Sequence, residues 1–113
     1  VRPFKVSPRI KLRERICWVA EMMRSKIRIY AAGRGWMMFE AKKVESTSRI
    51  LRHAKEALEH CLAMVDHIIR FARMGRFRKA IQELQFIKGV LWTLGVCSED
   101  DMASECSLEP EIA

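Results

Sequence analysis

Residues 46–75 read STSRILRHAKEALEHCLAMVDHIIRFARMG, and this stretch decides the fold. Its apolar residues recur at alternating spacings of three and four, which keeps them on one side of an α-helix. They are Leu51, Ala54, Leu58, Cys61, Val65, Ile68 and Ala72. Ser46 or Ser48 is a suitable N-cap, and Gly75 stands where a left-handed residue would end the helix. The stretch therefore predicts a long helix that packs against neighbours.

A third helix is predicted over residues 77–94, where the same spacing returns. Its apolar positions are Phe77, Ala80, Leu84, Ile87, Leu91 and Leu94. Gly75 and Arg76 are the whole connection between the two helices, so the helices must run antiparallel as an αα-hairpin. A glycine lies inside the third helix at position 89, where it is costly unless another backbone approaches. The first helix or a second subunit would supply that backbone.

A first helix is predicted over residues 8–32, because Ser7 and Pro8 form a good helix start. Its apolar stripe consists of Leu12, Ile16, Val19, Ala20, Met23, Ile27 and Tyr30. Residues 33–35, Gly-Arg-Gly, end it. Residues 26–30 also alternate with a period of two, so a short hairpin of residues 26–31 against 36–41 is the competing interpretation.

Residues 36–39 are four large apolar side chains in a row, Trp-Met-Met-Phe, and no single face of a helix can bury all four. Other elements surround them, or some of them meet a partner. Residues 36–45 form either a separate helix or the start of one helix over residues 36–74, and we favour one helix with a kink. The kink would lie near Ser46–Ser48, since Ser and Thr inside a helix bond to carbonyls and bend its axis.

Charge is distributed unevenly along the 113 residues, whose net charge is +7. Residues 1–34 carry net +8, residues 35–79 net +5 and residues 80–113 net −6. Residues 98–101 resemble a helix start with acids near the positive end of the helix dipole, so a short helix to about Cys106 and then a loose terminus are expected. We therefore predict an all-α protein, an antiparallel hairpin or bundle of three to four long helices over residues 1–97, with an acidic tail at 98–113.

Four cysteines are present without a C-x-x-C pair, and Cys17 and Cys61 lie among apolar helical residues, where a thiol behaves as a small hydrophobe. This use of cysteine favours a reducing, cytoplasmic setting over a disulfide scaffold. The sequence shows no secretory leader pattern and no apolar run of membrane-spanning length, so we expect no membrane association.

Catalytic and metal-binding patterns are weak. The chain has no G-x-S-x-G, phosphate-binding loop or dinucleotide fingerprint, so we expect no enzyme activity and no cofactor. His53, His60 and His67 form a stripe spaced by sevens, about 10 Å apart along a helix, which is too far for one metal ion. We interpret the stripe as packed or polar and expect no metal site.

Basic residues carry the leading functional hypothesis. On the first helix, cations crowd one side and also flank Trp18, as a surface for a nucleic-acid backbone would require. The connection after the central helix adds further cations. The predicted nucleic-acid-binding residues are Arg9, Lys11, Arg13, Arg15, Trp18, Arg24, Lys26, Arg28, Arg34, Arg76 and Arg78. We predict backbone-directed binding with low sequence specificity, because no base-reading motif is present.

Two other functions stay open. The first is a protein-binding adaptor or inhibitor that uses exposed aromatic and Met side chains, and the second is a structural subunit of a homo-oligomer. The adaptor would contact its target through Trp36, Met38, Phe86 and Trp92. In the homo-oligomer the basic and acidic ends would pair between copies, and the side of the third helix with Phe86, Gly89 and Trp92 would be buried. Apolar faces wider than one hairpin covers favour the homo-oligomer.

Overall fold

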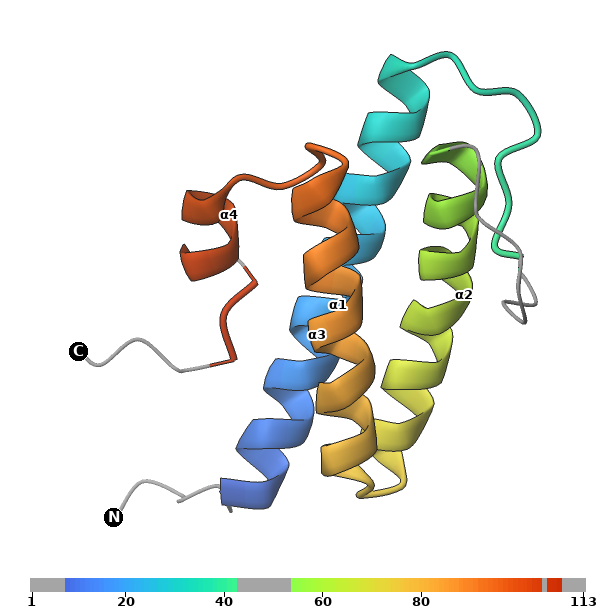
Figure 1. The fold of residues 1–113 in the computed structure, drawn as a ribbon. Helices are drawn as coiled ribbons and strands as arrows, with labels where there is room; N and C mark the ends of the chain where they lie inside the picture. Colours follow the sequence, from blue (N-terminus) through green and yellow to red (C-terminus); the bar gives the residue numbers. More distant parts are fainter. Residues whose placement is uncertain (1–7, 43–53, 105, 109–113) are drawn as a thin grey trace, which may run out of the picture.

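Four α-helices make up the described part of the protein, in a computed structural model that covers residues 8–42, 54–104 and 106–108. Their bounds are α1 Pro8–Gly33, α2 Ala54–Arg73, α3 Phe77–Thr93 and α4 Glu99–Ser104. All regular structure in these residues is helical, which confirms the all-α class. Figure 1 shows α1, α2 and α3 packed together, with the short α4 beside the end of α3.

The core lies between α1, α2 and α3, and each helix buries the middle of the stripe that its sequence predicts. The described end positions are half-buried, namely Leu12, Tyr30, Ala54, Phe77 and Leu94. The fully buried members on α1 are Ile16, Val19, Ala20, Met23 and Ile27. Those on α2 include Leu58, Cys61, Val65, Ile68 and Ala72, and those on α3 are Ala80, Leu84, Ile87 and Leu91. Leu62 and Ile69 of α2 are buried as well, because α2 contacts both other long helices.

The connection between α2 and α3 consists of Met74, Gly75 and Arg76. Gly75 has φ of +78°, and the Arg76 N–H donates to the Phe71 carbonyl at 2.9 Å, as in a helix end closed by a left-handed glycine. Gly75 therefore ends α2 as predicted. The N-terminal part of the predicted central helix, with Ser46, Ser48 and Leu51, lies outside the described residues.

Residues 26–42 differ from two of the expectations. Residues 26–33 belong to α1, so the competing hairpin of 26–31 against 36–41 is wrong. Residues 36–42 are not helical, so the interpretation of 36–45 as a helix, or as the start of one helix to 74, is wrong as far as residue 42. Gly35 with φ of +67° and Met38 with φ of +55° turn the chain away from α1. Local apolar packing outweighs helix propensity here, because the Trp36 ring contacts Tyr30 and Phe39, each at 5.8 Å between centroids.

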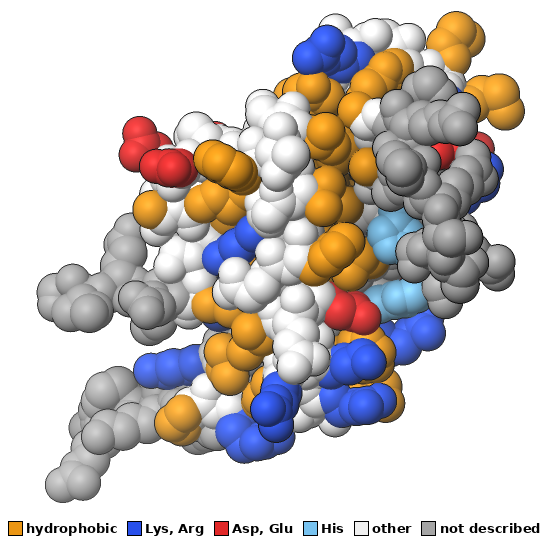
Figure 2. Space-filling model, in the orientation of Figure 1, with side chains coloured by type: hydrophobic (Ala, Val, Ile, Leu, Met, Phe, Trp, Pro, Cys, Tyr) orange, Lys and Arg blue, Asp and Glu red, His pale blue; other side chains and the backbone are white. Residues whose placement is uncertain are grey.

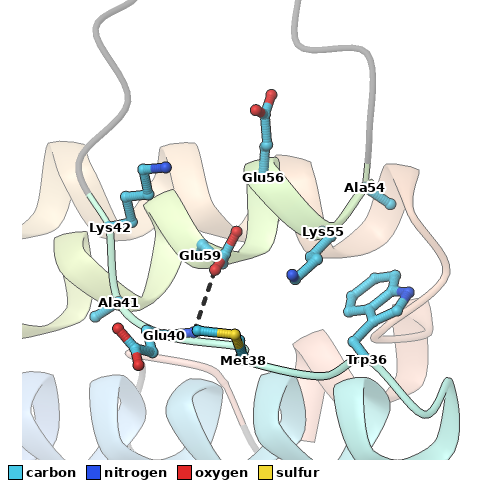
Figure 3. A pocket seen from close by; sticks show the side chains of 9 residues that line it. All are labelled: Trp36, Met38, Glu40, Ala41, Lys42, Ala54, Lys55, Glu56 and Glu59. Atoms are coloured by element: carbon cyan, nitrogen blue, oxygen red, sulfur yellow. Dashed lines mark hydrogen bonds between the residues drawn. The ribbon is translucent and has the colours of Figure 1, made fainter.

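Glu59 on α2 holds this non-helical segment in place. Its carboxylate accepts the Glu40 N–H at 3.2 Å, and its carbonyl accepts the Lys42 N–H at 3.0 Å. Figure 3 shows the Glu59 side chain reaching from α2 toward the non-helical residues 38–42. The two bonds satisfy backbone groups that a helix would have paired internally.

The C-terminal segment packs on the body of the protein. Cys106 is fully buried, and Met102 and Leu108 contact the core. Ser98 precedes α4 and pairs with Asp101, which confirms the predicted helix start. Ser107 and Leu108, where the sequence suggests a loose terminus, therefore belong to the packed structure.

Among the described helices, none has the length and apolar character needed to cross a membrane.

Candidate nucleic-acid interface

The start of α1 meets the connection between α2 and α3. Arg9 of α1 donates from Nη2 to the Gly75 carbonyl at 3.5 Å, and its guanidinium lies over the Phe77 ring, 4.8 Å from the centroid. These contacts place the basic first turn of α1 beside the basic residues 76–79. Figure 2 shows Lys and Arg side chains gathered at this end of the molecule, where the α2–α3 connection lies in Figure 1.

We call this surface the basic end. It comprises the side chains of Arg9, Arg13, Arg70, Arg73, Arg76, Arg78 and Lys79. Arg13 and Arg73 both lie near Cys17, where their positive charges partly oppose the rise in the pKa of that thiol caused by burial. Arg70 and Arg73 line a depression of mixed charge, which also contains Arg24 and the acids Glu21 and Asp66. The start of α1, the end of α2 and the start of α3 thus bring cations from residues 9–13 and 70–79 to one end of the molecule.

A groove of about 480 Å³ lies within the basic end. Arg9, Gly75, Arg76, Phe77, Arg78, Lys79 and Gln82 line it. Four of these seven residues are cationic and none is acidic. This excess of cations in the lining gives the groove a positive potential that attracts anions and is weakened by salt.

The first turn of α3 adds to this potential. Arg76 is its N-cap and makes no side-chain capping hydrogen bond, and the first turn contains no acidic residue. The backbone N–H groups at a helix start have no partner within the helix and carry the positive end of its dipole. An anion in the groove would meet both these groups and the surrounding side chains.

Aromatic rings hold several cations of the basic end in position. Arg76 lies over Phe71 at 5.2 Å, and Lys79 lies over the same ring at 5.8 Å. Together with Arg9 on Phe77, these contacts reduce the freedom of three long side chains before any ligand arrives. The sequence analysis did not single out Phe71 or Phe77 for this role. A local signal exists, because both phenylalanines lie in the basic run FARMGRFRK.

Other predicted binding residues on α1 lie elsewhere. Arg24 bonds to Glu21 and to Asp66 of α2, so two carboxylates balance its charge. Arg34 donates to the Tyr30 hydroxyl at 2.8 Å, and that hydroxyl donates to the Leu94 carbonyl at 3.4 Å. Arg34 therefore lies near the end of α3, away from the groove. Arg28 is exposed and is five turns further along α1 than Arg9.

The remaining predicted residues of α1 face the C-terminal segment. Arg15 donates from Nε to the Ser107 carbonyl at 2.7 Å and lies over the Trp18 ring at 4.4 Å. Lys11, Arg15 and Trp18 share a hollow of about 570 Å³ with Leu108. Lys26 lies close enough to Asp101 for its charge to help lower the pKa of that carboxyl group. α4 and residues 106–108 therefore occupy part of the α1 surface that the sequence predicts for nucleic acid.

The residues predicted for a protein-partner or oligomer interface lie on two separate parts of the surface. Trp36 is half-buried in the aromatic cluster, whereas Met38 nearby is 82% exposed. Phe86 and Gly89 line a shallow groove of about 470 Å³ between α2 and α3, and Trp92 is 56% exposed on α3. A Cβ at Gly89 would have no atom within 4 Å, so the expectation that the first helix packs against Gly89 is wrong.

Metal-binding groups do not cluster in the described residues, where no set of three or more His, Cys, Asp or Glu side chains is placed to hold an ion. His60 and His67 are half-buried on α2, and His53 lies outside the described residues. A hollow of about 780 Å³ lies between α2 and residues 36–42 and carries Glu40, Glu56 and Glu59 beside Lys42 and Lys55 (Figure 3). Its mixed charges give it no clear preference for an anion.

Comparison of the chain with known protein families, with curated proteins and with solved structures finds no match.

Proposed function

We propose that the protein binds the phosphate backbone of nucleic acid through the basic end. The observation that supports this proposal most directly is the groove lined by four cations and no acid at the start of α3. A phosphate group in it would accept hydrogen bonds from Arg side chains and from helix N-terminal N–H groups. The antiparallel arrangement of α2 and α3, which we infer from their three-residue connection, brings the end of α2 and the start of α3 to the same surface.

The binding would depend strongly on salt and little on sequence. Cations that neutralise phosphates release condensed counterions, so log K falls linearly with log salt. Contacts with phosphates position a protein on nucleic acid without reading its bases. Phe71 and Phe77 already carry cations on their rings, so we assign them to fixing those cations and not to stacking on bases.

A charge-matched pair of variants tests the location of the site. Arg76→Gln with Arg78→Gln removes two cations from the basic end, and Arg28→Gln with Arg34→Gln removes two from the distant part of α1. Fluorescence anisotropy of a labelled duplex and a labelled single strand is measured from about 50 to 200 mM salt, the range in which phosphate contacts are most sensitive. The first variant should flatten the slope of log K against log salt by about two units. The second should leave the slope nearly unchanged.

Equal effects of the two variants would show that only overall charge matters and would overturn the assignment to the basic end. Failure of the wild type to bind either probe at low salt would overturn the function itself. Circular dichroism of both variants provides the folding control, because Arg76, Arg78 and Arg28 are exposed and their loss should leave helicity unchanged.

Self-association is a second candidate function, supported by the shallow groove around Phe86. Phe86 is 55% exposed, and Val90, Leu94 and Ala57 line the groove beside it. Burial of such an apolar surface against a second copy would stabilise a dimer. Phe86→Glu should then lower the mass seen by light scattering coupled to gel filtration, with helicity unchanged. A wild-type monomer at high micromolar concentration would contradict this candidate.

A further inference from the structure

Cys97 precedes α4 in the sequence and Cys106 follows it, and their side chains are neighbours in space. Their side chains are hydrogen-bonded to each other, and they are 2% and 0% exposed. Cys97 follows the turn that ends α3, and Cys106 follows α4. The sequence analysis treated cysteines only as small apolar residues and did not find this pair. No sequence signal marks it, because the spacing fits no known disulfide or metal motif.

Backbone bonds hold both cysteines in place. The Cys97 N–H donates to the Leu91 carbonyl at 3.3 Å, and the Cys106 N–H donates to the Asp101 carbonyl at 3.1 Å. The segment after Cys106 is fixed to α1 by the bond from Arg15 to the Ser107 carbonyl. The end of α3 therefore positions Cys97. Contacts with α4 and α1 position Cys106 beside it.

We propose that Cys97 and Cys106 form an intramolecular disulfide by exchange with a small-molecule disulfide such as oxidised glutathione, and that this bond fastens the α4 segment to the end of α3. The two side chains already contact each other, and a bond of about 2.05 Å between the sulfur atoms requires such proximity. This inference is independent of the proposed nucleic-acid binding.

The exchange proceeds in two balanced steps. One cysteine thiolate attacks glutathione disulfide, which forms a mixed disulfide and releases the first glutathione thiolate. The second cysteine thiolate attacks the protein sulfur of that mixed disulfide, forms the Cys97–Cys106 bond and releases the second glutathione. The two protons from the cysteine thiols end on the two glutathiones, and the pair of electrons lost by the protein reduces the reagent.

The closed α4 segment controls the rate of this exchange. The hydrogen bond to Cys106 and burial both raise the pKa of the Cys97 thiol, so little thiolate exists in the closed form. The reagent therefore reacts when α4 and residues 106–108 open transiently. The Arg15–Ser107 bond opposes that opening, and its loss should speed the reaction.

Cys17 and Cys61 serve as internal comparisons. Cys17 lies on α1 near Arg13 and Arg73, and Cys61 lies within the buried seam of α2. Burial raises the pKa of the Cys61 thiol to about 12, which keeps it unreactive while the protein is folded. Neither is among the groups that act on the Cys97 thiol, so a specific product should leave both as thiols.

The test uses the full chain incubated with glutathione disulfide, quenched with an alkylating reagent and analysed by mass spectrometry. The wild type should lose two of its four thiols, and peptide mapping should show Cys97 linked to Cys106. The variant Cys17→Ser with Cys61→Ala should give the same link. Cys106→Ser should give no internal link, and since that buried change can affect folding, mapping of the wild type itself decides the question.

The rate at which the Cys97–Cys106 link forms distinguishes the proposed opening of α4 from a general exposure of thiols. Arg15→Gln should speed formation of the link roughly tenfold, as expected when a charge-assisted hydrogen bond that holds the closed form is lost. Arg28→Gln, a matched change at an exposed site on the same helix, should not alter the rate. Adducts of glutathione without an internal link, or a link that involves Cys17 or Cys61, would overturn the proposal.

Discussion

Gly75 shows how one residue couples the end of a helix to the candidate site. Its φ of +78° is accessible to glycine at little cost, and its carbonyl accepts Arg9. A Cβ added there would also meet Arg9 Nη2 at 3.3 Å. The same glycine therefore ends α2, turns the chain into α3 and helps to hold Arg9 over Phe77.

Two glycine substitutions should have opposite effects on the free energy of unfolding. Gly75→Ala should lower it by about 1–2 kcal/mol, because alanine is strained at positive φ. Gly89→Ala should raise it by about 1 kcal/mol, because alanine favours a helix interior and nothing lies within 4 Å of the added methyl. Urea unfolding followed by circular dichroism measures both. A destabilising Gly89→Ala would show that another surface packs closely there.

Asp101 makes the start of α4 sensitive to acid. The Ser98 N–H donates to Asp101 Oδ2 at 3.2 Å, and the Asp101 N–H donates to Ser98 Oγ at 3.1 Å. Backbone hydrogen bonding from Ser98, followed by the Ser98 side chain and the charge of Lys26, holds the pKa of Asp101 below its usual range. The stabilisation is thus fully present above the ordinary Asp pKa of about 3.9 and is lost as pH falls through the lower folded pKa.

Hydrogen exchange of the backbone amides in α4 measures this loss of stability at low pH. Exchange of the α4 amides should accelerate as the pH falls below about 4, beyond the intrinsic pH dependence of exchange. Asp101→Asn should remove this acid-dependent step, because an amide does not titrate in this range. Asp100→Asn is the control and should retain the step, since Asp100 takes no part in the reciprocal pair with Ser98. An unchanged step in Asp101→Asn would assign the acid sensitivity to another group.

At the scale of elements, the path of residues 36–42 depends on α2. The buried Glu59 accepts two hydrogen bonds from that segment. Its carboxylate accepts the Glu40 N–H, and its carbonyl accepts the Lys42 N–H. A continuous helix through this region would have needed neither bond. The sequence cannot reveal this arrangement, because the partner of each backbone group lies on a helix that starts after residue 53.

Removal of the Glu59 side chain should loosen that segment. Glu59→Ala should lower the free energy of unfolding by about 1–3 kcal/mol, because the partly buried Glu40 N–H loses its acceptor and the buried Glu59 side chain leaves a cavity. Glu59→Gln retains an oxygen that can accept this bond and should cost less. Tryptophan fluorescence at Trp36, in a variant with Trp18 and Trp92 replaced by Phe, reports the local change. Equal costs for the two substitutions would show that the bond to Glu40 is not the cause.

At the scale of the whole molecule, α4 is acidic and the surface around the α2–α3 connection is basic. Figure 2 shows acidic side chains on α4 and basic side chains gathered around the α2–α3 connection. Deletion of residues 98–113 is a poor test of the effect of the acids on binding, because it also removes the buried Cys106 and the core contact of Leu108. Neutralising exposed acids avoids this loss of packing.

The double change Glu99→Gln and Asp100→Asn should strengthen nucleic-acid binding at low salt and have little effect at high salt. Both residues are exposed on α4, so their charges act on a polyanion over a distance that the Debye length limits to about 10 Å at 0.1 M salt. Glu40→Gln with Glu56→Gln, which removes two acids beside residues 36–42, is the matched comparison. Anisotropy titrations at several salt concentrations measure the effect. A gain that persists at high salt would indicate direct exclusion by α4 instead of long-range repulsion.

The sequence alone determined the all-α class, the apolar stripes of α1, α2 and α3, and the C-terminal ends of these helices to within about two residues. These features are local, since helical periodicity and the left-handed preference of glycine act within a few residues. The tertiary structure decided which cations form the basic end, which are balanced by Glu21 and Asp66, and where residues 36–42 run. It also paired Cys97 with Cys106. Such features depend on contacts between residues far apart in the chain, and periodicity along the sequence carries no information about the distance between them.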